Sequence, residues 1–335
     1  MTDSSASGGG ALAESGEPFD PPLAHVYRAR VRTKRVVRRT PLQHSPWLSR
    51  HAGVPVHLKL ECWQHTNSFK LRGAYNAVST VDPAHRAAGL VTASAGNHGQ
   101  AVALAARLHG ATATVFVPES APSAKRNRIR AFGGVLREVP GSYDDAAAAA
   151  RAYEEEAGAR FIHGFNDPEV VAGQGTVGLE IVEELPELTT VVVPVGGGGL
   201  IAGVGLVVKS LVGTGARVLG AQSEETVAMH AAFTAGRVTP VPVTDTLCDG
   251  LAGETEQESF ERAWRVVDSL HLVTERSVAR SMRLLFDQER VVAEGSGAVG
   301  VAAVLEGLPL EGPTTIVVSG GNVDGRTLAR ILGND

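Results

Sequence analysis

A lysine stands beside an aromatic side chain in the stretch NSFKLRGA, residues 67–74. Lys70 directly follows Ser68 and Phe69, in a segment that begins like a helix and is not strongly polar. Desolvation beside an aromatic ring lowers the pKa of a lysine and frees its lone pair for attack on an aldehyde. Lys70 is therefore a candidate nucleophile and, after that, a candidate base.

Four consecutive glycines follow a strand-like run in VVVPVGGGGLIAG, residues 191–203. Glycines between a strand and a helix expose backbone N–H groups at a helix N-terminus, which favours phosphate binding. No Gly-Lys-Ser/Thr sequence closes the turn, so it is not a P-loop. Gly197, Gly199 and Ala202 also fit the loose pattern G-x-G-x-x-A. Because Glu224 lies near the end of the next strand-like run, a nicotinamide-dependent dehydrogenase remains a remote alternative.

A second turn of small residues, SAGNHG, precedes an alanine-rich helical stretch. Its exposed N–H groups suit an anion smaller than a phosphate, such as a carboxylate. Taken alone, Asn97 and His98 are better explained as helix-capping and turn residues. The candidate carboxylate loop consists of Ser94, Ala95, Gly96, Asn97 and His98.

A hydroxyl side chain, Ser319, ends the strand-like run TTIVVSG at residues 314–320. It can contact a ring nitrogen or simply cap the turn. Pyridoxal phosphate requires an amine for its Schiff base, a phosphate site, a partner for its ring nitrogen and a donor near its 3′-oxygen. The lysine, the tetraglycine turn, the carboxylate loop and this hydroxyl together therefore predict an enzyme that uses pyridoxal 5′-phosphate.

Alternating strand-like and helix-like stretches must position these groups. The repeated order of strand and helix predicts an α/β fold, with parallel sheets that carry helices on both faces. The run VVVPV lacks alternation, as expected for a strand buried on both faces. We expect strands at 54–60, 89–94, 111–118, 134–139, 189–195, 216–222 and 314–320, and helices at 98–110, 123–133, 143–158, 173–185 and 295–307.

The overall composition indicates a globular protein of one large or two modest domains, at 335 residues and 43% hydrophobic content. The net charge of -5 gives no electrostatic reason to expect nucleic acid. No apolar run approaches the roughly 20 residues of a membrane span, and no signal-peptide core is present. Cys62 and Cys248 lack a CxxC spacing, which favours a reducing compartment. We expect a cytoplasmic protein without nucleic-acid or membrane partners.

The N-terminal part divides into two segments. Residues 1–21 are rich in glycine, serine and alanine and predict a disordered tail. The next segment, HVYRARVRTKRVVRRTPL, is dense in arginine and can be read as a nucleic-acid arm. Because the whole chain is acidic, we favour a solvated helix face with Val31, Val36 and Val37 turned inward.

From RTPL almost to the C-terminus, the chain resembles the serine/threonine dehydratases of the fold-type-II pyridoxal-phosphate enzymes, a group that includes serine racemases. The resemblance is carried by LKLECWQHTNSFKLRGAYNAV, SAGNHGQAVALAA, AGQGTVGLEI, PVGGGGLIAG, EGSGAVGVAAVL and SGGNVD. It implies a tryptophan-synthase-β-like fold with two open, twisted, mostly parallel sheets flanked by helices. It also implies a large cofactor-binding domain of residues 22–88 and 167–335, a small domain of residues 89–166 that carries the carboxylate loop, and a homodimer.

The resemblance also implies a role for each matching residue. Lys70 forms the Schiff base and then removes the substrate Cα proton. Phe69 packs near the cofactor, Asn97 contacts its 3′-oxygen, and Ser319 meets its pyridine nitrogen. Backbone N–H groups of Gly196, Gly197, Gly198, Gly199 and Leu200 wrap the phosphate, while Ser94, Ala95, Gly96, Asn97 and His98 lie in the loop that receives the substrate carboxylate.

The implied reaction is β-elimination of water from a 3-hydroxy L-amino acid, L-threonine or L-serine, which gives a 2-oxo acid and ammonia. Serine racemases have a second serine where this chain has Ala95, so racemisation is disfavoured. The segment LCDGLAGETEQESF, residues 247–260, is unusual for a threonine enzyme. A bulkier substrate, 3-phenylserine or 3-hydroxyaspartate, therefore stays open.

Three further positions are ambiguous. Gln222 and Ala228 replace the acids of the metal-binding members of the group, so no metal site is expected. Asn166 and Asp167 either face the cofactor or form a surface turn. For Glu294 we favour a charge at a helix N-terminus over a pocket acid.

Overall fold

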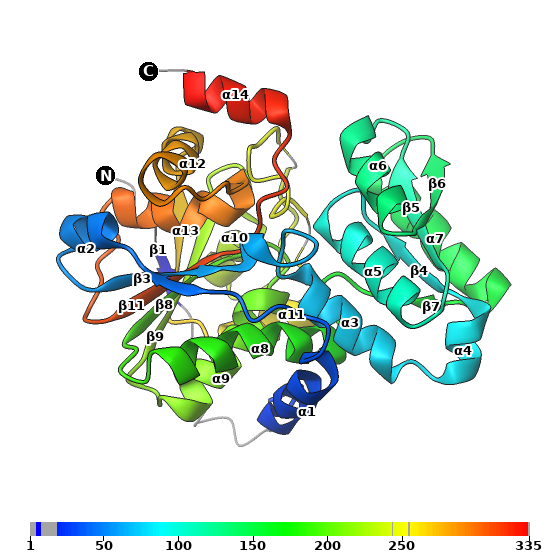
Figure 1. The fold of residues 1–335 in the computed structure, drawn as a ribbon, viewed down its shortest axis with the longest axis horizontal. Helices are drawn as coiled ribbons and strands as arrows, with labels where there is room; N and C mark the ends of the chain where they lie inside the picture. The colour runs from blue at the N-terminus through cyan, green and yellow to red at the C-terminus, as the bar shows by residue number, and fades with distance from the viewer. Residues whose placement is uncertain (1–4, 8–18, 243, 254, 334–335) are drawn as a thin grey trace.

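Two β-sheets with helices around them organise the chain (Figure 1). The computed structural model describes residues 5–7, 19–242, 244–253 and 255–333. The larger sheet has the strand order β1-β10-β9-β8-β11-β3-β2 and the smaller one has the order β6-β5-β4-β7. The strands are β1 (Ser5–Ser7), β2 (Leu42–His44), β3 (Val56–Leu60), β4 (Leu90–Ala93), β5 (Ala113–Pro118), β6 (Val135–Val139), β7 (Arg160–Phe161), β8 (Thr190–Pro194), β9 (Arg217–Ser223), β10 (Ser269–Val273) and β11 (Thr314–Val318).

The helices cover both faces of the larger sheet and flank the smaller one. They are α1 (Leu23–Thr33), α2 (Pro46–Ala52), α3 (Lys70–Thr80), α4 (Pro83–Ala88), α5 (Asn97–Leu108), α6 (Ser123–Ala131), α7 (Tyr143–Ala157), α8 (Pro168–Glu184), α9 (Gly199–Leu211), α10 (Ala228–Ala235), α11 (Gln257–Trp264), α12 (Glu275–Glu289), α13 (Gly295–Leu305) and α14 (Gly325–Gly333), with a 3-10 turn, η1, at Glu61–Trp63. Figure 1 shows α8 and α9 on one side of the larger sheet and α12 and α13 on the other. Within the described residues, no helix is long and apolar enough to cross a membrane.

The predicted α/β architecture is confirmed. All seven predicted strands and all five predicted helices are present, with ends within a few residues of those expected. The smaller sheet is wholly parallel. The larger sheet is parallel except at its two edges, where β1 pairs antiparallel with β10 and β2 pairs antiparallel with β3. Every residue of β8 is buried, with Val191 and Val193 in one hydrophobic core and Val192 in the other. A strand buried on both faces explains the unbroken apolar run.

The predicted inward face of the arginine-rich segment is wrong for Val31 but holds for Val37, which is half-buried and packs against a hydrophobic core. Val31 is 65% exposed, and α1 ends at Thr33, before Val36 and Val37. The buried face of α1 is instead formed by Val26, Ala29 and Thr33. Val31 lies five positions after Val26, which is about 140° around a helix that turns ~100° per residue.

The N-terminal tail is only partly described. Residues 1–4 and 8–18 of the segment predicted to be disordered lie outside the described residues. Ser5–Ser7 form strand β1, which pairs antiparallel with β10, and Phe19 is buried in the hydrophobic core. The prediction of disorder therefore fails for these four residues.

Candidate active site

Lys70 is the first residue of α3, next to the end of β11. The backbone N–H of Phe69 donates to the carbonyl of Ser319 at 3.1 Å, which fixes the start of the helix against that strand end. The ammonium nitrogen of Lys70 donates to the carbonyl of Gly164 at 2.7 Å and lies 5.2 Å from the centroid of the Phe69 ring. Burial lowers the pKa of Lys70 to about 8. A neutral amine is therefore accessible near physiological pH.

Lys70 differs from the other lysines of the chain. Three of the five lysines are bound to carboxylates, Lys59 to Glu180 at 2.7 Å, Lys209 to Asp268 at 2.8 Å, and Lys125 to Asp249. Lys34 is exposed. Lys70 combines burial with a neutral partner, a backbone carbonyl, and so its lone pair is the most available.

The tetraglycine turn connects β8 to α9, as predicted. Gly198 adopts a φ of +90°, which a residue with a side chain rarely adopts. A Cβ on Gly197 would lie 2.5 Å from the ring of Phe165, and one on Gly196 would lie 3.0 Å from Leu251 Cα. The backbone must therefore stay bare here, with its N–H groups at the start of a helix of 13 residues. This is the geometry of an anion cradle.

Asn97 begins α5 and makes contact with a buried acid. Its side-chain Nδ2 donates to Oε1 of Glu294 at 2.6 Å, and its Oδ1 accepts from the Nδ2 of Asn322 at 2.6 Å. The other oxygen of Glu294 accepts from the backbone N–H of Asn322 at 3.1 Å. Burial, together with repulsion from Asp249, raises the pKa of Glu294 to about 7.

Glu294 lies at a helix N-terminus, as predicted, but its carboxylate does not cap that helix. It occupies the N-cap position of α13, but its side chain makes no capping hydrogen bond there. The carboxylate turns toward Asn97 instead, and a Cβ on Gly320 would collide with it. Glycine at position 320 leaves the room that this carboxylate needs.

Ser319 lies at the carboxyl end of β11, as expected. Its hydroxyl is buried and donates to the carbonyl of Ser296 at 3.3 Å. At 3.3 Å this contact is weak, so the hydroxyl can turn its hydrogen toward another acceptor.

The carboxylate loop is formed, but His98 does not supply a cation to it. Ser94 Oγ accepts from the N–H of Gly96 at 3.2 Å, which closes a small turn. The Nε2 of His98 faces the carbonyl of Ile162 at 2.9 Å, so this nitrogen carries the proton. Burial lowers the pKa of His98 to about 3, with a contribution from Lys70, and the ring is therefore neutral. Its Nδ1 is buried without a hydrogen-bond partner among the described residues.

Comparison with known proteins decides the family. Residues 33–320 match the family described as pyridoxal-phosphate dependent enzyme. The chain belongs to this family. The nicotinamide alternative is thereby excluded, and pyridoxal phosphate is the cofactor.

Two curated relatives of the pyridoxal-phosphate family show where the similarity lies. An L-threonine ammonia-lyase of Thermotoga maritima is 44% identical over 312 residues, which cover 92% of this chain and 78% of that protein. A serine racemase of Oryza sativa subsp. indica is 34% identical and covers 95% of each chain.

Solved structures confirm the fold type. Maize serine racemase superposes with a TM-score of 0.88 at 33% identity, covering 92% of this chain and 95% of that one. Threonine deaminase isoform 2 of Solanum lycopersicum gives a TM-score of 0.87 at 30% identity, covering 95% and 90%. The predicted fold-type-II architecture is thus confirmed.

The described residues fit this cofactor. A bare glycine turn suits its phosphate, the amine of Lys70 its aldehyde, and the buried hydroxyl of Ser319 its ring nitrogen. Two buried polar atoms near Lys70, the Oγ of Ser68 and the Nδ1 of His98, have no hydrogen-bond partner among the described residues. Unpaired buried polar atoms are rare in folded proteins, and a polar ligand bound beside Lys70 would give these two a partner.

The described residues 247–253 and 255–260 include two that pack against the glycine turn, Leu251 and Ser259. The backbone of Leu251 lies against Gly196, and the carbonyl oxygen of Ser259 would be 3.3 Å from a Cβ on Gly198. This packing brings together residues that are about 55–60 positions apart in the chain, so the local sequence does not reveal it. These two residues therefore form part of the wall of the glycine turn.

The loop at residues 163–167 contacts both Lys70, through the carbonyl of Gly164, and Glu256. His163 donates from Nε2 to Glu256 at 2.9 Å, and Asn166 donates to the same carboxylate. Asp167 caps α8 by accepting from the N–H of Glu169 at 2.7 Å. Asn166 thus holds Glu256, and Asp167 has a turn role.

The positions compared with metal-binding members hold other contacts. Gln222 donates to the carbonyl of Thr226 at 2.6 Å, and Ala228 begins α10. Across the described parts of the chain, no group of three or more His, Cys, Asp or Glu side chains is arranged to hold a metal ion.

Proposed function

We propose that this protein is a pyridoxal-phosphate-dependent ammonia-lyase. It converts a 3-hydroxy L-amino acid, L-threonine or L-serine, to a 2-oxo acid and ammonia. The similarity to an L-threonine ammonia-lyase over 92% of the chain supports the reaction class. The single structural observation that carries it is the half-buried Lys70, whose nitrogen donates to the Gly164 carbonyl and has no ion pair among the described residues. Overall, the substrate loses its Cα proton and β-hydroxyl as water, and one water is then consumed as ammonia leaves.

Each part of the site has a proposed task. The cofactor, when bound, supplies the electron sink for the pair left by the broken Cα–H bond. The Nζ of Lys70 takes that proton, which its lowered pKa permits near neutral pH. The N–H groups of Gly196, Gly197, Gly198, Gly199 and Leu200 hold the phosphate, Phe69 packs beside the ring, Asn97 meets the 3′-oxygen, Ser319 meets the ring nitrogen, and the loop of Ser94, Ala95, Gly96, Asn97 and His98 receives the substrate carboxylate.

Elimination is proposed over racemisation because of Ala95. A methyl group has no proton to exchange, so the loop offers no second acid at this position. Lys70 then remains the one group assigned to proton transfer at Cα.

The substrate test is a release assay. Ammonia and 2-oxo acid are measured with serine, threonine, 3-phenylserine and 3-hydroxyaspartate for the wild type and for Lys70→Ala. The proposal expects release from serine or threonine by the wild type and none by the variant. Release only from the two bulkier substrates would move the assignment to them, and release by Lys70→Ala would contradict it.

Organisation and assembly are proposed in the same way. We propose a large domain of residues 22–88 and 167–335 and a small domain of residues 89–166, supported by the division of the strands between two sheets. A homodimer and a cytoplasmic location are also proposed. Light scattering after size-exclusion chromatography tests the dimer by its mass.

A further inference from the structure

A cavity lined by cationic side chains opens where α1, α3 and α8 meet, and Lys70 is not among its lining residues. Its volume is about 170 Å³. Four cations line it, Arg30, Lys34, Arg39 and Arg72, against one carboxylate, Glu180. The arginine-rich segment after residue 27 supplies three of the four. Neither a nucleic-acid arm nor the predicted inward face explains why these side chains converge.

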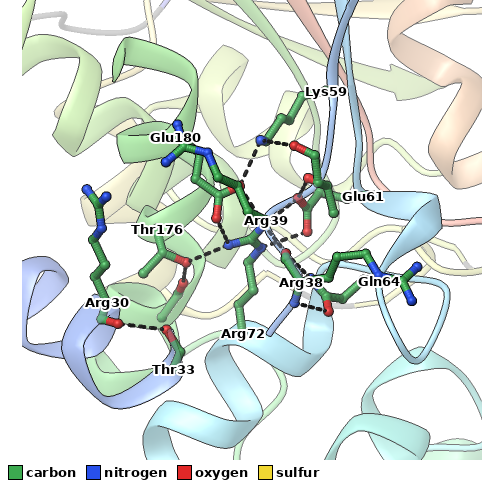
Figure 2. A network of polar contacts seen from close by, with 12 residues as sticks. Arg30, Thr33, Arg38, Arg39, Lys59, Glu61, Gln64, Arg72, Thr176 and Glu180 are labelled. Carbon is green, nitrogen blue, oxygen red and sulfur yellow. Dashed lines mark hydrogen bonds and ion pairs between the residues drawn. The ribbon is translucent and has the colours of Figure 1, made fainter. Parts of the chain in front are cut away.

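The inner wall of the cavity is already neutral. Figure 2 shows the Arg72 guanidinium between Glu61 and Glu180. Arg72 is fully buried and donates to both carboxylates in two-pronged contacts of 2.8–2.9 Å, and Lys59 binds Glu180 at 2.7 Å. Two cations and two buried carboxylates therefore cancel, so Glu180 has no charge left to offset the outer cations.

The outer wall has an excess of positive charge. Arg30 and Arg39 share Glu183, and Arg39 also binds Glu184, in contacts that are largely exposed. Exposed ion pairs are weak, so both arginines can turn to a new anion. Lys34 has no ion pair or hydrogen bond of its side chain among the described residues, although it borders the cavity.

We propose that this cavity binds a phosphate group. At roughly 30 Å³ per water molecule, the volume holds about five waters, which is room for one tetrahedral oxyanion. It is well below the 300–1,000 Å³ or so typical of sites for larger ligands, so a phosphomonoester must keep its organic part outside. Arginine forks and a lysine ammonium are the side chains that proteins use most for phosphate.

The position of the site ties it to the rest of the molecule. Arg72, the inner wall, stands two residues after Lys70 on α3, and its partners lie on η1 and α8. A phosphate bound there would hold α1 to α3 and α8. Binding should therefore raise the temperature of unfolding as well as release heat.

The test is calorimetric titration of the holoenzyme with inorganic phosphate and, separately, with glycerol 2-phosphate. Ionic strength is kept constant with sodium chloride. The cofactor keeps free phosphate from the glycine turn in this form. We expect saturable binding, weakened about tenfold or more by Lys34→Gln, since one charged hydrogen bond is lost. The matched control is Arg35→Gln, which removes the neighbouring exposed cation outside the cavity and should leave binding unchanged.

The two ligands distinguish the source of the phosphate. Binding of both supports a site open to a phosphomonoester, and binding of inorganic phosphate alone supports a site closed to it. Absence of saturable binding to the wild type would overturn the proposal. The proposal would also be overturned if Lys34→Gln bound phosphate as tightly as the wild type. It would be overturned as well if Arg35→Gln weakened binding as much as Lys34→Gln does, because the affinity would then depend on the net charge near α1 and not on this cavity.

Discussion

Asn97 and Glu294 stand 197 positions apart in the chain and share a hydrogen bond of 2.6 Å. Asn97 begins α5 beside the smaller sheet, and Glu294 precedes α13 beside the larger one. The contact therefore ties the two sheets together at the candidate site. It also holds an acid in a place where burial raises its pKa to about 7.

Replacing this acid should change the pH dependence of stability. Glu294 titrates near 4.5 when unfolded and near 7 when folded, so the folded state binds more protons between these values. The free energy of unfolding of the wild type should thus fall by about 3 kcal/mol across this range relative to Glu294→Gln, whose amide does not ionise. Urea unfolding of both proteins, freed of cofactor, measures the difference. A difference that is constant with pH would show that Glu294 is not perturbed.

The lowered pKa of Lys70 should control cofactor binding. Only the neutral amine attacks an aldehyde, and its fraction rises as the pH passes the pKa. The rate of association of pyridoxal phosphate with the cofactor-free protein should therefore increase around pH 8 rather than near the ordinary value of 10.5. Stopped-flow absorbance at a series of pH values measures it. A midpoint near the ordinary value would mean that Lys70 is solvated.

A methyl group in the glycine turn should weaken cofactor binding. In Gly197→Ala the new Cβ would lie 2.5 Å from the Phe165 ring, so the turn must shift. Overpacking of this kind costs about 1–3 kcal/mol, which predicts a dissociation constant raised roughly five- to hundredfold. Gly215→Ala is the control, because a Cβ there meets nothing within 4 Å. Equal affinities in fluorescence titrations of the two variants would contradict the assignment of the turn.

The hydrogen-bonded ion pairs of Arg72 with Glu61 and Glu180 should be among the strongest single contributions to the free energy of unfolding. Arg72→Met leaves the buried carboxylates of Glu61 and Glu180 without this partner, at an expected cost of about 3–5 kcal/mol. Arg30→Met removes an exposed pair with Glu183 and should cost about 0–1 kcal/mol. Chemical unfolding of both variants tests the contrast. Similar losses in the two would show that burial does not set the cost.

Local sequence predicted the parts of the site that depend on local geometry. The positions of Lys70, the tetraglycine turn and Ser319 could each be predicted from the residues around it. In each case the neighbouring strand end, turn or helix start lies within about ten residues of that position. The buried β-branched runs likewise identified the central strands. These features are set by backbone sterics and burial near the residue itself.

What could not be predicted depends on contacts between distant segments. Glu294 was assigned to a helix terminus because nothing near it in the chain shows that Asn97 would reach it. Residues 247–260 were unexplained because their partner is the glycine turn. Val31 was placed inward from its apolar type, although the phase of α1 is set by Val26 and Ala29 against α8 and α9.

The lysine nitrogen that binds the cofactor can be identified directly by one measurement. The holoenzyme is reduced with borohydride, which makes the lysine–cofactor bond permanent, and is then digested and mapped by mass spectrometry. We predict the pyridoxyl mass on Lys70 and on none of the other four lysines. The added mass on a different lysine, or none on any of them, would contradict the central claim.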